Sequence, residues 1–113
     1  MDKKITTFVD SLMERHARFM EQPYKDLLRN FVISFFNAVS NDNITHEKAL
    51  VLIDSLDNKE KLTYFIEEYS PDYPDFISYL RQIANLNKFM IPALKVTVMQ
   101  LFNDFVSAAH ESH

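Results

Sequence analysis

Carboxylate and phenol side chains gather between residues 57 and 79, around a segment (residues 70–75) that two prolines interrupt. Carboxylates attract cationic groups, and tyrosine offers binding surfaces a large apolar ring with a hydroxyl that forms hydrogen bonds. Loops carry a large share of binding residues, so this segment is the first candidate for a site. We expect a partner-binding surface made of Glu60, Glu67, Glu68, Asp72, Tyr73, Asp75 and Tyr79.

Residue types and spacings argue against other chemistry. The four histidines form no His-Glu-x-x-His pattern, and no glutamate precedes a histidine by three residues. Cysteine is absent, which excludes thiolate ligands and cysteine nucleophiles. Glycine is absent too, so phosphate-binding loops, dinucleotide-binding turns and the strained serine turn of hydrolases cannot form in their usual way. We therefore expect no metal, no cofactor and no enzyme activity.

The negative charge of the chain is concentrated in its middle third. The net charge is −4, while residues 1–48 and 87–113 each balance their acids and bases. A charged helix face is commonly just solvated, and that interpretation stays open beside the binding one. In the binding interpretation, the patch steers a basic protein partner. Its acids are Asp54, Asp57, Glu60, Glu67, Glu68, Asp72 and Asp75, against Lys59, Lys61 and Arg81.

Direct contact with nucleic acid is disfavoured by the arrangement of the basic residues. Binding of nucleic acid needs a basic footprint. The best candidate set of basic residues is interleaved along the sequence with acidic residues, so the local electrostatic field is nearly neutral. A helix pair over residues 45–69 has the length of a helix-turn-helix, but its second helix carries more acids than bases, which phosphates would repel. The candidate basic set is Arg15, Arg18, Lys25 and Arg29, among Glu14, Glu21 and Asp26.

Helical periodicity dominates the chain and predicts an all-α fold, a compact single-domain bundle of five to six helices spanning residues 1–113. The clearest stripe lies within residues 24–40, where apolar residues recur at helical spacing and Ile33 falls outside the pattern. Asn41, Asp42 and Asn43 predict a left-handed loop. Thr45 is the expected cap of the next helix, and Asp57 of the helix after it. Further helices are expected over residues 3–21, 45–56, 57–69, 74–86 and 92–109.

The last predicted helix is apolar around much of its circumference. Such a helix is either central in a bundle or shared with a second chain, so a homodimer through residues 88–109 is one expectation. No segment reaches the roughly 20 apolar residues of a membrane span, and the first residues lack the pattern of a signal peptide. We expect a cytoplasmic protein that does not contact membranes.

These observations favour a small, acidic, non-enzymatic protein-binding module. Its expected role is that of a regulator, inhibitor or immunity or adaptor-type protein that engages a basic protein partner. The alternative is a dimeric helical transcriptional regulator or DNA-associated protein, which would use the basic residues of the first two helices.

Overall fold

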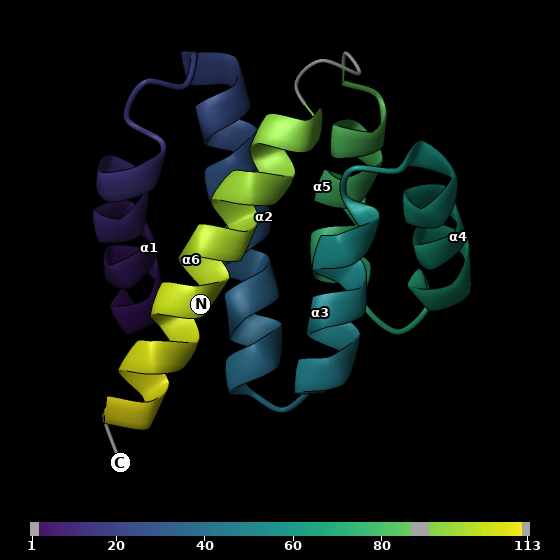
Figure 1. Ribbon diagram of the computed structural model, residues 1–113. Helices are drawn as coiled ribbons and strands as arrows, with labels where there is room; N and C mark the ends of the chain where they lie inside the picture. The colour runs from purple at the N-terminus through teal and green to yellow at the C-terminus, as the bar shows by residue number, and fades with distance from the viewer. Residues whose placement is uncertain (1–2, 87–90, 112–113) are drawn as a thin grey trace.

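Six α-helices make up the computed structural model, which describes residues 3–86 and 91–111 (Figure 1). Within these two ranges there is no strand, which confirms the predicted all-α bundle. None of the six helices is long and apolar enough to cross a bilayer. The helices are α1 (Lys3–His16), α2 (Gln22–Ser40), α3 (His46–Ser55), α4 (Lys59–Tyr69), α5 (Pro74–Ala84) and α6 (Ile91–Glu111).

The core forms around α2, which contacts α1, α5 and α6. Phe35 on this helix is fully buried, and its ring centroid lies 5.5–5.9 Å from those of four other phenylalanines. The apolar stripe predicted for α2 is therefore confirmed. Ile33 is also buried although it lies outside the stripe, because neighbouring helices cover α2 on more than one side. The residues that α2 buries are Leu28, Phe31, Val32, Ile33, Phe35 and Phe36.

Two helix starts show how capping side chains set the boundaries. Thr45 caps α3 as predicted, since its hydroxyl accepts a hydrogen bond from the Lys48 backbone N–H at 3.1 Å. The predicted cap of α4 was wrong by one residue. Asn58 takes that position and accepts from the Lys61 backbone N–H at 3.0 Å. Asp57 instead contacts the Lys95 ammonium at 2.9 Å, so its carboxylate serves a contact between helices.

Two apolar residues that fit the helical spacing of the helices predicted over residues 3–21 and 45–56, and were therefore expected to face the core, are exposed instead. Phe19 is 89% exposed because α1 ends at His16, earlier than periodicity predicts, and Phe19 falls in the turn that follows. The guanidinium carbon of Arg18 lies 4.7 Å from its ring centroid. Leu50 on α3 is 40% exposed. This short helix contacts only α4 and α6 closely, so its outer side has no covering element.

The turn after α2 is made without glycine. Asp42 has φ 59°, the only positive φ among the described residues. Aspartate tolerates this left-handed conformation better than most residues, as the Asn-Asp-Asn segment predicts. The backbone N–H of Asn43 then donates to the Ala38 carbonyl at 2.9 Å, which folds the loop back along the last turn of α2. The loop thus brings Asn41 and Asn43 to the same end of α2.

Candidate functional site

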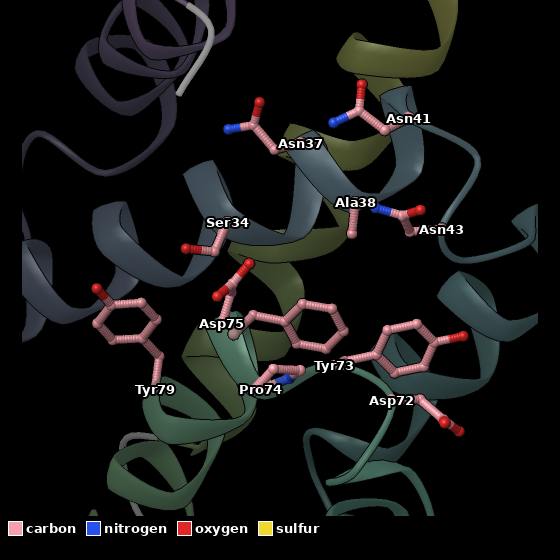
Figure 2. A pocket seen from close by; sticks show the side chains of 11 residues that line it. Ser34, Asn37, Ala38, Asn41, Asn43, Asp72, Tyr73, Pro74, Asp75 and Tyr79 are labelled. Atoms are coloured by element: carbon pink, nitrogen blue, oxygen red, sulfur yellow. The ribbon is translucent and has the colours of Figure 1, made fainter.

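An open cavity of about 760 Å³ lies between the second half of α2 and the start of α5 (Figure 2). Its lining comes from three places: one face of α2, the left-handed loop after it, and the proline-bounded segment that leads into α5. Polar side chains predominate in the lining. It consists of Ser34, Asn37, Ala38, Asn41, Asn43, Asp72, Tyr73, Pro74, Asp75, Phe76 and Tyr79.

The α2 side of the cavity presents hydrogen-bonding groups. Ser34, Asn37 and Asn41 follow one another at spacings of three and four residues, which places them on one helix face. The side-chain amide nitrogen of Asn37 donates to the Ile33 carbonyl at 2.9 Å. This bond engages one N–H of the Asn37 amide, and Figure 2 shows the amide directed away from Asp75.

The α5 side is built on the aromatic core. Phe76 is 1% exposed and packs against Phe31 and Phe35 of α2. Tyr73 stacks on Phe76 with ring centroids 5.3 Å apart and an interplanar angle of 18°. The half-buried Tyr73 ring is therefore held in place from below by the core. Pro74 fixes the first turn of α5, which starts the helix beside this ring.

Asp75 occupies the centre of the site. Figure 2 shows its carboxylate directed toward Ser34 of α2, with Tyr79 on one side and Tyr73 on the other. Asp72 lies at the edge, and its carboxylate points away from α2. No lysine, arginine or histidine is found among the described residues that line the cavity. The cavity therefore holds negative charge without a positive group beside it.

Among the described residues, other aspartates form ion pairs with basic side chains, which Asp75 does not. A hydrogen bond from Arg29 lowers the pKa of Asp10, and the charge of Lys61 lowers that of Asp54. Within the parts of the chain that the structure describes, neither Asp72 nor Asp75 has an ion pair or a side-chain hydrogen bond. Two carboxylates at one cavity are thus left to interact with a cation from outside.

Four of the seven predicted binding residues line this cavity: Asp72, Tyr73, Asp75 and Tyr79. The other three, Glu60, Glu67 and Glu68, are exposed on α4 and do not belong to the lining. None of the predicted binding residues lies on the α2 side of the cavity. A signal for it exists, because Ser34, Asn37 and Asn41 recur at helical spacing within an otherwise apolar segment.

The basic residues of the alternative function do not form an open positive patch. Arg15 contacts Asp104 at 3.3 Å, and Arg29 contacts Asp10. The Lys25 ammonium donates to the Arg18 carbonyl at 3.3 Å. Two of the four cations predicted to contact nucleic acid are therefore neutralised by carboxylates of the same chain.

The segment predicted to form a dimer corresponds mostly to α6, and its residues 88–90 lie outside the described residues. α6 buries Leu94, Val98, Leu101 and Phe102 within its own chain. Val96 is 59% exposed and borders a second cavity of about 420 Å³. Homodimer formation through this helix stays a prediction.

The contact between α1 and α6 makes a pH-dependent contribution to stability. His16 Nε2 lies 2.8 Å from Asp104, and this hydrogen bond, with the charges of His16 and Arg15, lowers the pKa of Asp104. Stabilisation by Asp104 is therefore complete above the ordinary pKa of an aspartate, about 4, and disappears as the pH falls through the lowered value. Because the Asp104 side chain is 35% exposed, we expect less than about 1 kcal/mol.

Urea unfolding of the wild type and of Asp104→Asn, repeated from about pH 6 to about pH 2, measures the contribution of Asp104 to stability. The difference in free energy of unfolding should shrink as the pH falls. A difference that stays constant from pH 6 to pH 2 would contradict the assignment.

Comparisons with known proteins do not assign the chain to a family. No family model matches it, and the searches of curated proteins and of solved structures find no match. What the protein binds is therefore inferred from the geometry and charge of the cavity.

Proposed function

We propose that this protein is a non-enzymatic binding module whose cavity between α2 and α5 receives a basic segment of a partner protein. The observation that supports this most is the pair of carboxylates, Asp72 and Asp75, at a cavity whose described lining has no cationic group. By binding such a segment the module would regulate or inhibit its partner, or act as its adaptor.

The composition of the lining favours binding over catalysis. Its one serine, Ser34, has no imidazole in the described lining to remove its proton, which hydroxyl nucleophiles commonly require. The tyrosines and amides instead suit recognition, because they supply apolar area and hydrogen bonds at low cost in side-chain entropy. The volume of about 760 Å³ lies within the range of ligand pockets, roughly 300–1,000 Å³.

Nuclear magnetic resonance can locate the binding surface on the ¹⁵N-labelled protein. The probe is an acetylated tetrapeptide of alternating arginine and lysine, and the control is the same peptide with glutamate at every position. We expect amide shifts at residues 34–43 and 72–79 with the basic peptide alone. The shifts should weaken as salt is raised from about 0.05 to 0.5 M, because ions screen exposed charges.

A different pattern would overturn the proposal. Shifts centred on Glu60, Glu67 and Glu68 would place the binding surface on α4, outside the cavity. Absence of any saturable shift at millimolar peptide would show that the cavity does not receive basic segments.

A further inference from the structure

We propose that Lys48 limits the positive charge that the cavity accepts, so that the partner's segment carries a cation at the Asp75 end and an uncharged residue at the end near Tyr69. This inference rests on the proposed function and describes the charge pattern of the segment. It depends on three features of the structure: the position of the Lys48 ammonium, the aromatic rings that join it to the cavity, and a local setting that disfavours a lysine.

The Lys48 ammonium lies beside the cavity without lining it. Its nitrogen is 4.9 Å from the ring centroid of Tyr69, and that centroid is 6.2 Å from the centroid of Tyr73, which lines the cavity. The ammonium is therefore at most about 11 Å from the Tyr73 ring centroid, close to one Debye length, which is about 10 Å at 0.1 M salt. At such a separation its charge repels a cation that binds at this end of the cavity.

A row of aromatic rings joins Lys48 to the cavity wall. Tyr69 packs on Phe65 with ring centroids 4.6 Å apart, and Tyr73 stacks on Phe76. Lys48 is half-buried, and within the described ranges its ammonium has no carboxylate partner. Aromatic ring faces attract cations, and Lys48 already occupies the ring of Tyr69. A second cation, from a ligand, would meet a like charge at this ring.

The position of Lys48 in its helix disfavours a lysine. It is the third residue of α3, and its backbone N–H donates to the hydroxyl of the capping residue Thr45. At this place after a threonine cap a glutamate completes a capping box, and the positive end of the helix dipole disfavours a cation. Residues that break such local rules are found at functional sites. We therefore attribute this lysine to the cavity beside it rather than to the stability of α3.

The two ends of the cavity then differ in charge. Figure 2 shows the Asp75 carboxylate at the centre and Asp72 at the edge. The backbone N–H of Asp72 donates to the Tyr69 carbonyl at 3.0 Å, so Asp72 and the Lys48 ammonium are both held at Tyr69, and their charges offset one another. The Asp75 end stays negative. A segment with its cation at Asp75 and an uncharged residue beyond Tyr73 fits this distribution better than a uniformly basic one.

Charge reversal at Lys48 tests the inference with the basic tetrapeptide in about 0.1 M salt. Lys48→Glu should tighten binding at least about threefold, because attraction replaces repulsion. Lys48→Gln, which only removes the charge, should give a smaller gain, and Lys48→Arg should bind as the wild type does. Glutamate and glutamine both suit this position after the Thr45 cap, so these variants keep α3. Thermal unfolding establishes that each variant folds.

Lys59→Glu is the matched control for net charge. Lys59 is exposed at the start of α4, about 15 Å along the helix axis from Tyr69. Because salt screens charge over this distance, the affinity for the tetrapeptide should change less than about 1.5-fold.

A probe with one cation tests the charge pattern. N-acetyl-lysine amide should place its ammonium at the Asp75 end, away from Lys48. We expect Lys48→Glu to change its affinity less than about 1.5-fold, against at least about threefold for the tetrapeptide. Nuclear magnetic resonance titration of the labelled protein measures both dissociation constants.

The outcomes distinguish this inference from the proposed function. Equal gains from Lys48→Glu and Lys59→Glu, or equal gains for the two probes, overturn the role of Lys48 and leave the proposed function intact. So does tetrapeptide binding that Lys48→Glu leaves unchanged. Absence of saturable tetrapeptide binding to the wild type and to every variant overturns the proposed function, and this inference with it.

Discussion

Replacing Phe35 with alanine is expected to lower the free energy of unfolding by about 3–5 kcal/mol, the usual cost of removing a fully buried phenylalanine. The residue is 0% exposed, and its ring contacts join three helices. Phe31 and Phe36 lie on its own helix, Phe76 on α5 and Phe102 on α6. The truncation leaves a cavity between these rings that rigid helices fill only in part. Urea unfolding followed by circular dichroism measures the change.

Phe19→Ala is the matched control because it makes the same chemical change at a ring that is 89% exposed. Its effect should stay within about 0.5 kcal/mol, as is usual at exposed sites. The expected loss from Phe35→Ala is a large part of the total stability of a small domain, about 5–15 kcal/mol. Similar effects of the two substitutions would show that the aromatic core lies elsewhere.

The parts of the fold that could be predicted follow from local rules. The spacing of apolar residues along α2 predicts both a helix and its buried face, because residues three or four positions apart lie on the same side of a helix and pack together into the core. The cap at Thr45 and the left-handed turn at Asp42 likewise depend on the side chain and its immediate backbone.

The errors arise where distant parts of the chain decide the outcome. Phe19 fits the period of α1, but the helix ends before reaching it. Leu50 fits the period of α3, yet no helix packs over that side. Neither the end of a helix nor the coverage of a short helix by its neighbours can be determined from the apolar spacing alone.

The candidate site was predictable on one side only. Tyr73, Asp75 and Tyr79 are close in sequence, so their grouping could be seen directly. The polar face of α2 lies more than thirty residues away, and only the packing of α2 against α5 brings the two together. The clustering of acidic residues in the sequence also placed Glu67 and Glu68 among the predicted binding residues, but both lie on the exposed side of α4.

Reversal of charge at Asp75 is expected to have the largest effect on binding. Asp75→Lys puts a positive group at the centre of the cavity, so the affinity for the basic tetrapeptide should fall at least about tenfold, or 1.4 kcal/mol. Part of any loss could come from the start of α5, where a negative side chain favours the helix. Asp75→Asn and thermal unfolding of each variant separate that structural effect from the loss of charge.

Glu67→Lys changes the net charge by the same amount on the exposed side of α4, outside the cavity lining. The most direct test is therefore the dissociation constant of the basic tetrapeptide for wild type, Asp75→Lys and Glu67→Lys, measured by calorimetry in one buffer. We predict a loss of at least about tenfold for Asp75→Lys and less than about threefold for Glu67→Lys. Equal losses in the two variants would mean that the peptide responds only to net charge, and would contradict a binding site in the cavity between α2 and α5.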